Sequence, residues 1–195
     1  MKIKQQIISI CLAALSLNTY GQNHSGIYMN LSDYKANKLT YEIECSKEKH
    51  NRNIHLHDFF GNRPTVTVNH DGKKYTLKKN EIYGFIDCDN EAYRFFKNEV
   101  YHIAEAGDIY IYIYTQTQNI AQSKGYKVVN NYYFSNTPSG QILRLTKDNL
   151  KNEFRNNDKF IALLDQNFGN DDIYAYDNLH KTFKVNYVYS KSTKQ

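Results

Sequence analysis

The sequence contains no tryptophan and only two prolines and nine glycines among its 195 residues. Tryptophan is the strongest aromatic platform for stacking a sugar, so its absence weighs against a flat sugar-binding face. The scarcity of proline and glycine, and the lack of any low-complexity tract, leave no segment that resembles a linker. We therefore expect one domain.

The chain also lacks a concentration of charge. Lys and Arg total 25 and Asp and Glu total 20, which gives a net charge of +5. The basic residues form no dense run, and the pairs Lys73–Lys74 and Lys78–Lys79 resemble exposed hairpin residues. This excess is too small and too dispersed for a nucleic-acid-binding surface, so we predict no nucleic-acid partner.

Only one apolar run is long enough to be a targeting signal. Ile7–Leu17 is too short to span a bilayer but has the length of a signal-peptide core. Lysines precede this run, and Thr19 and Gly21 are small residues at the positions that a signal peptidase reads. We predict that residues 1–21 are a signal peptide and that residues 22–195 form a single α+β domain. The mature chain is then periplasmic or secreted, with no transmembrane segment.

The three cysteines leave alternatives open. Cys11 lies inside the apolar run after Ile10, where a lipoprotein needs a small residue. A lipid anchor at Cys11, like a buried N-terminal strand or helix, is therefore a weaker alternative to the signal peptide. Cys45 and Cys88 each lie on the apolar side of an alternating pattern and are predicted to point inward. In an oxidising compartment they can form a disulfide, and otherwise they are small buried hydrophobic residues.

Alternating apolar and polar residues predict a series of strands joined by tight turns. The expected turns are at Asp71–Gly72, Asp89–Asn90, Gly107 and Asn136–Ser139. Asp-Gly is a strong hairpin signal because its residues tolerate a positive φ. Consecutive hairpins of this kind predict an antiparallel meander.

Helical spacing replaces this alternation near the C-terminus. Thr146 is a predicted N-cap, and an apolar stripe then follows through Phe168. Residues 177–190 fit a helix or a strand, and a helix is favoured. Ser32 is the predicted N-cap of a short helix near residues 32–37. The chain is therefore expected to be α+β, with a twisted antiparallel β-sheet meander and C-terminal helices packed on one face.

The stretch from Gly107 to Gln118, "GDIYIYIYTQTQ", alternates perfectly. Its isoleucines must form core, because burying each is worth roughly 2 kcal/mol or more. Tyr110, Tyr112 and Tyr114 then take the other face, where tyrosine suits a half-wet surface. A cross-strand ladder is the simpler explanation of this row. The alternative is a surface that binds a ligand or a protein or glycan partner.

Few residues form a pattern typical of metal sites. His55 and His57 share one face of a predicted strand and are the best metal candidates, although they remain weak without a nearby third ligand. Asp87, Asp89 and Glu91 resemble the start of a calcium loop, but the required glycine and final glutamate are missing. We therefore predict no metal and no cofactor.

Signatures of catalysis are also missing. The sequence has no Gly-x-Ser-x-Gly elbow and no glycine-rich phosphate loop, and its two mature cysteines are predicted to be buried. Two carboxylates could still meet in space, as hydrolysis of a glycoside requires. We predict that the protein is not an enzyme.

Several segments resemble a known group of sequences. They are "GIYMNLSDYKANK", "DFFG", "IYGFIDCDNEAYRFF", "HIAEAGDIYIY", and "ILRLTKDNLKNEF" with "KFIALLDQNF". Together they are similar to small exported proteins of Bacteroidetes-type bacteria, over nearly all of the mature chain. That group has no assigned reaction or ligand, so the resemblance implies export and assigns no site residue.

These observations favour a non-enzymatic domain of the cell envelope or a secreted domain, with a Tyr-rich sheet face as its binding or structural surface. A hydrolase acting on envelope or dietary polymers is one alternative. A periplasmic inhibitor or immunity protein is another. The predicted partner is a protein or glycan of the cell envelope.

Overall fold

The computed structural model describes residues 24–46, 53–56, 63–119, 126–169 and 172–193. The predicted signal peptide, residues 1–21, and the candidate ligand His57 lie outside these ranges.

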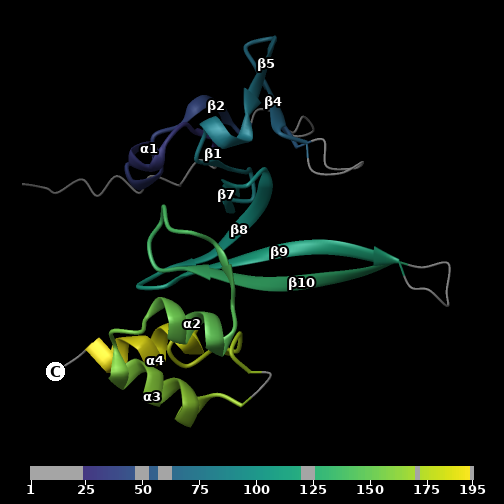
Figure 1. Ribbon diagram of the computed structural model, residues 1–195. Helices are drawn as coiled ribbons and strands as arrows, with labels where there is room; N and C mark the ends of the chain where they lie inside the picture. The colour runs from purple at the N-terminus through teal and green to yellow at the C-terminus, as the bar shows by residue number, and fades with distance from the viewer. Residues whose placement is uncertain (1–23, 47–52, 57–62, 120–125, 170–171, 194–195) are drawn as a thin grey trace, which may run out of the picture.

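An eight-stranded antiparallel sheet organises the fold (Figure 1), in the order β11-β10-β9-β8-β7-β6-β1-β2. The six strands from β6 to β11 are neighbours in chain order, which confirms the predicted meander. The first two strands extend the sheet beyond β6. The bounds are β1 (His24–Tyr28), β2 (Thr40–Glu44), β6 (Gly84–Ile86), β7 (Ala92–Phe96), β8 (Glu99–Ala106), β9 (Tyr110–Asn119), β10 (Tyr126–Ser135) and β11 (Leu143–Arg144).

The hairpin predicted around Asp71–Gly72 forms, but outside the meander. Asp71 and Gly72 have φ values of 49° and 71°, the positive values that a two-residue turn needs. The hairpin belongs to a separate three-stranded sheet, followed by a short 3₁₀ turn. The bounds are β3 (Ile54–His55), β4 (Thr65–His70), β5 (Lys73–Lys78) and η2 (Lys79–Glu81).

The helices confirm one predicted cap and correct another. Thr146 caps its helix, and its side chain accepts a hydrogen bond from the backbone N–H of Asn149. The first helix is capped by Asn30 and not by Ser32. Asn30 has the extended backbone of an N-cap, and its Oδ1 accepts from the N–H of Asp33 at 2.9 Å. The bounds are α1 (Leu31–Lys35), α2 (Lys147–Glu153), α3 (Asp158–Asn167) and α4 (Lys184–Thr193).

The ambiguous segment 177–190 contains both kinds of structure. A small hairpin, β12 (Tyr176–Asp177) and β13 (Thr182–Phe183), precedes α4. Only the second half of the segment is helical, so the predicted helix is correct for that half and wrong for the first.

The isoleucine side of β9 is buried at its start, as predicted, whereas Ile113 further along the strand is only half-buried. Ile109 and Ile111 are fully buried. In Figure 1 the three C-terminal helices lie below β9 and β10, while the three-stranded sheet lies at the opposite end of the molecule. The buried cluster around Ile111 includes Phe134 of β10 and inner residues of the three helices: Leu150, Phe160, Leu164, Val185 and Val188.

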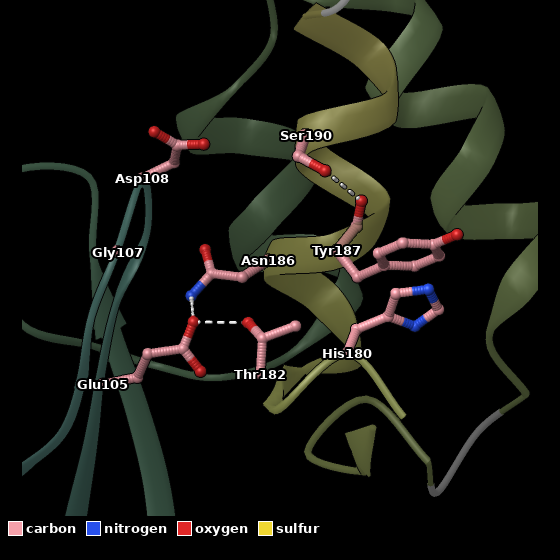
Figure 2. Close-up of a pocket in the computed structure, with 8 residues that line it drawn as sticks. All are labelled: Glu105, Gly107, Asp108, His180, Thr182, Asn186, Tyr187 and Ser190. Carbon is pink, nitrogen blue, oxygen red and sulfur yellow. Dashed lines mark hydrogen bonds between the residues drawn. The ribbon is translucent and has the colours of Figure 1, made fainter. Parts of the chain in front are cut away.

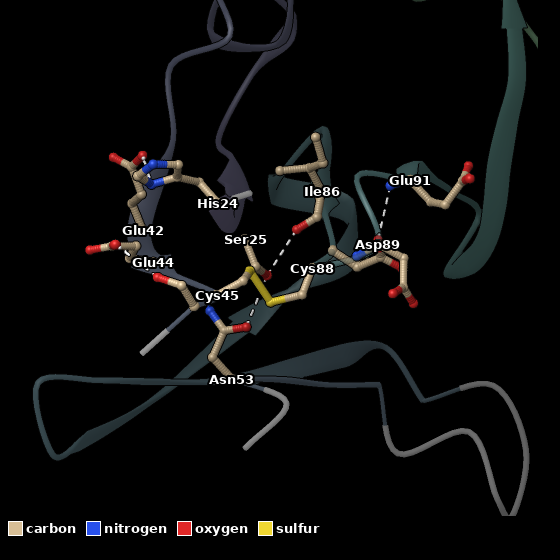
Figure 3. Close-up of a disulfide and its surroundings, with 12 residues drawn as sticks. His24, Ser25, Glu42, Glu44, Cys45, Asn53, Ile86, Cys88, Asp89 and Glu91 are labelled. Atoms are coloured by element: carbon tan, nitrogen blue, oxygen red, sulfur yellow. Dashed lines mark hydrogen bonds and ion pairs between the residues drawn. A yellow bond between two sulfur atoms is a disulfide. The ribbon is translucent and has the colours of Figure 1, made fainter. Parts of the chain in front are cut away.

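A disulfide decides the question that the sequence left open. Cys45, just after β2, is bonded to Cys88, in the turn after β6, with 5.6 Å between their Cα atoms (Figure 3). Ser25 of β1 packs beside this bond, and its Oγ donates to the backbone carbonyl of Ile86 at 2.9 Å. The bond therefore fastens the outer strands to the start of the meander.

Candidate functional site

The tyrosine row of β9 is less exposed than the sequence predicts. Tyr112 is fully buried, while Tyr110 and Tyr114 are half-buried. The hydroxyl of Tyr112 accepts from Nη1 of Arg94 at 3.1 Å and lies 3.0 Å from Oγ of Ser135. Tyr112 therefore offers no surface to a ligand. A variant in which Tyr110, Tyr112 and Tyr114 are all replaced by serine would lose a core side chain, that of Tyr112.

The loop between β10 and β11 covers this face. The Tyr83 hydroxyl donates to the carbonyl of Pro138 at 3.0 Å, and Nη2 of Arg94 donates to the carbonyl of Gly140 at 2.8 Å. The turn predicted at Asn136–Ser139 implies a strand directly after it, over residues 140–145, but only Leu143–Arg144 pairs. The residues before it instead lie across the tyrosine side of the sheet.

Burial changes the acidity of several of these phenols. Burial, with the nearby Tyr110 and Tyr112 as smaller causes, raises the pKa of Tyr34 to about 12. Burial also raises the pKa of Tyr101 to about 12, and that of Tyr114 to about 12 with the help of a hydrogen bond to Glu99. The same tyrosines pack with Tyr112, Ile103 and Ile142 in a separate, partly polar buried cluster.

The exposed aromatic residues lie on the other side of the same hairpin. Tyr126, Val128 and Tyr132 alternate along β10 and so share one face of the sheet. Tyr132 stacks on Tyr174, with centroids 5.0 Å apart and planes 10° apart. We call Tyr126, Val128, Tyr132, Tyr174 and Tyr176 the aromatic strip.

Most exposed large apolar side chains of the described residues belong to this strip. Tyr126 is 74% exposed, Val128 64%, Tyr176 50% and Tyr174 45%; the fifth, Leu179, follows in the β12–β13 turn. Phe183 of β13 links the two ends of the cluster, because its ring contacts both Tyr132 and Tyr176. A grouped apolar surface of this kind marks a binding site more often than scattered single residues do.

The strip extends along a two-stranded arm. β8 pairs with β9 only as far as Ile113, and β11 pairs only with Tyr133 and Phe134, so the outer halves of β9 and β10 run on as a ribbon (Figure 1). One signal of this arm is present in the sequence but was not part of the predictions above. The apolar alternation of β9 stops after Tyr114, although the strand continues through Thr and Gln.

A groove of about 530 Å³ opens between the β8–β9 turn and α4 (Figure 2). Glu105 closes its floor. The Oε1 atom of Glu105 accepts from Thr182 and Asn186, each at 2.6 Å, and Oε2 accepts from the backbone N–H of Phe183 at 2.7 Å. With these partners, Glu105 anchors α4 to the sheet and is not a free base.

His180 is the reactive group that borders this groove. Nδ1 of His180 pairs with Asp177 at 2.7 Å, and its ring stacks on Tyr187. The hydrogen bond from His180 lowers the pKa of Asp177. Figure 2 shows Asp108 well apart from His180, and Ser190 donates to the carbonyl of Tyr187. The groove therefore has an oriented histidine but no paired nucleophile among the described residues.

The described histidines, including the predicted metal candidate His55, each have a different partner and do not converge. His55 is exposed and contacts Asn69, His70 contacts Asp71, and His102 contacts Glu91. His102 and His180, which had no visible partner in the sequence, each pair with a carboxylate. Across the described ranges no three His, Cys, Asp or Glu residues come together as a metal site.

The calcium-like stretch forms a tight turn. Oδ1 of Asp87 accepts from the backbone N–H groups of Asp89 and Glu91, at 3.0 Å and 2.9 Å. The Asp87 carboxylate is therefore engaged with its own backbone, as in an Asx turn.

Within the described part of the chain, no helix is long and apolar enough to cross a bilayer. In comparisons with known proteins, the chain matches no family model, no curated protein and no solved structure.

Proposed function

We propose that this protein is a non-enzymatic binding domain that works outside the cytoplasm and holds a neutral glycan of the cell envelope along the aromatic strip. The observation that carries the proposal is that four of the five large apolar side chains exposed in the described residues lie on this strip. The predicted signal peptide and the Cys45–Cys88 disulfide support a site of action in an oxidising compartment.

The spacing of the strip suits an extended chain. At about 3.3 Å per residue, Tyr126 and Tyr132 are about 20 Å apart along β10, with Val128 between them. Tyrosine is a weaker stacking platform than the absent tryptophan, but it still supplies a large, rigid contact area at a low cost in conformational entropy. The apolar faces of successive sugar rings would pack on these side chains.

The charge of the arm favours a neutral ligand. Among the described residues 114–118 and 126–131, Lys127 is the only charged side chain, and most of the others are Thr, Gln, Asn or Tyr. Hydroxyl and amide groups of this kind pair with sugar hydroxyls. An anionic membrane or an acidic partner would call for a basic surface instead.

The test is retardation of the purified protein in native gels that contain an unbranched glucan, a xylan or a mannan. We expect at least one of these neutral polymers to retard the protein. The double variant Tyr126→Ser, Tyr174→Ser should weaken binding about tenfold or more, because it removes two stacking rings. Leu179→Ser is the matched control, since Leu179 is 84% exposed but lies outside the strip.

Salt distinguishes a neutral glycan from a charged partner. Retardation should be the same at low and high salt, because screening acts on charges and not on ring stacking. The proposal fails if no neutral polymer binds, or if the double variant binds as well as the unaltered protein. Release of reducing ends from the same polymers would favour the hydrolase alternative, with His180 as its first candidate.

A further inference from the structure

Arg94 of β7 is a buried cation with an unusual environment. The residue is only 5% exposed, and none of the ion pairs among the described residues includes it. Nη1 donates to the Tyr112 hydroxyl at 3.1 Å and Nη2 to the Gly140 carbonyl at 2.8 Å. Both acceptors are neutral, so the positive charge has no counter-charge.

A guanidinium group has five N–H donors, and these two contacts use two of them. Arginine at a buried position usually meets a carboxylate or a phosphate, whose two oxygens match its fork. An uncompensated buried charge lowers stability. The remaining donors, and the lack of a counter-charge among the described residues, both favour an anionic ligand.

Aromatic rings surround this charge. The guanidinium carbon of Arg94 lies 5.8 Å from the ring centroid of Tyr83, 5.5 Å from that of Phe96 and 5.9 Å from that of Tyr112. These rings partly stabilise the cation and exclude water. An anion in such an environment interacts with arginine more strongly than it would in bulk water.

Two further phenols border the same cluster and are half-exposed. Tyr34 of α1 stacks on Tyr83 with centroids 4.8 Å apart, and Tyr110 stacks on Tyr112 at 6.5 Å. Neither the Tyr34 hydroxyl nor the Tyr110 hydroxyl has a hydrogen-bond partner in the described structure. The raised pKa of Tyr34, to which Tyr110 and Tyr112 contribute after burial, agrees with their proximity. Both residues are half-exposed, so their O–H groups can donate to a ligand.

We propose that Arg94, with the hydroxyls of Tyr34 and Tyr110, binds an oxyanion: a carboxylate, sulfate or phosphate group. The site lies on the tyrosine face of the sheet, opposite the aromatic strip, and is independent of the glycan proposal. It gives part of the tyrosine row a role other than a flat stacking platform. Tyr110 donates a hydrogen bond, and Tyr112 positions Arg94.

The purified protein is titrated with sulfate, phosphate and acetate, and sodium chloride at equal ionic strength is the reference. Because the chain has no tryptophan, tyrosine emission is not masked, and a change in it that the Tyr34→Phe and Tyr110→Phe variants reduce comes from this site. We expect saturable binding and a rise in melting temperature beyond that in chloride. Glucuronate and glucose 6-phosphate then show whether a sugar-borne group binds more tightly than the free ion.

The variants Tyr34→Phe and Tyr110→Phe remove one donor each and keep both rings, so the fold should persist. Each should weaken binding about three- to tenfold, as expected for one hydrogen bond. Tyr126→Phe, which loses an exposed hydroxyl on the arm, is the matched control and should bind normally. Arg94→Met should abolish binding if it folds.

The proposal is overturned if none of the oxyanions acts beyond chloride. It is also overturned if Tyr34→Phe and Tyr110→Phe both bind as tightly as the unaltered protein. Neither result depends on whether Arg94→Met folds, and neither bears on the aromatic strip.

Discussion

Tyrosine has two opposite uses in this protein. Tyr112 is fully buried, and its hydroxyl has two partners, whereas Tyr126 is 74% exposed on the arm. The two residues lie on neighbouring strands that show similar alternation in the sequence. The difference between them is what covers each side chain. The β10–β11 loop covers Tyr112, and no described segment covers Tyr126. Tyrosine tolerates both settings because it has an apolar ring and a polar tip.

The buried phenols predict a loss of stability at alkaline pH. Burial is the main cause that raises the pKa of Tyr34, Tyr93 and Tyr101 to about 12, above the value of about 10 in an unfolded chain. The folded state therefore holds these protons more tightly than the unfolded state does. Their contribution to the free energy of unfolding is fully present below about pH 10 and is lost as the pH rises toward about 12.

Phenolate absorbance and urea unfolding, each followed against pH, test this expectation. A late-titrating group of tyrosines should appear, and the free energy of unfolding should fall across the same pH range. Titration in urea, where the tyrosines are exposed, is the control and should show a single early step. If the folded protein also titrates in that single step, these phenols are not buried as described.

At the scale of elements, the sequence predicted a turn and a helix cap, but it did not predict which distant segment covers a face of the sheet. Asp71–Gly72 and Thr146 act through their own backbone, so the sequence predicts their turn and cap correctly. Residues 136–142 have a strand-like composition at one end, yet they cross the tyrosine face because Tyr83 and Arg94 bind their carbonyls. Those partners lie more than 40 residues away, so no local pattern shows them.

The same limit applies to the binding surfaces, because a local pattern does not show which distant segments come together. Tyr110, Tyr112 and Tyr114 stand out in the sequence because their alternation is perfect, but alternation specifies only a face and not what covers it. The aromatic strip combines β10 with Tyr174 and Tyr176, which a short hairpin brings beside it. Only the β10 half of the strip has a signal in the sequence.

The disulfide predicts a measurable loss on removal. Cys45 and Cys88 are 43 residues apart, and in the chain-entropy model closing a loop of that length stabilises the fold by about 4 kcal/mol. The free energy of unfolding of the double variant Cys45→Ala, Cys88→Ala should therefore be lower by about that amount, and its urea midpoint should fall accordingly. Adding reductant to the unaltered protein should have a similar effect, and should leave the variant unchanged. An equal stability with and without the bond would contradict a structural role.

At the scale of the whole molecule, two of the buried clusters among the described residues lie on the same face of one continuous sheet. Strand pairing places Ile27, Phe85 and Tyr93 on one face of the sheet. The same face continues to β9, because Tyr93 pairs with His102 and His102 pairs with Ile113. One cluster, around Ile27, packs against the three-stranded sheet, and the other, around Ile111, packs against the helices. The unbroken ladder between them is the reason to expect that both ends fold together, as a single domain.

This expectation is tested with one substitution in each cluster. Ile27→Ala and Leu150→Ala each remove a fully buried side chain and should each lower the free energy of unfolding by about 2–5 kcal/mol. Because both clusters pack on one sheet, each substitution should shift a single cooperative unfolding transition. Tyrosine emission and far-ultraviolet circular dichroism should report that transition at the same midpoint. Their effects should add in the double variant, since the sites share no contacts. Two separate domains would behave differently: each substitution would split the curve, moving one part and leaving the other in place.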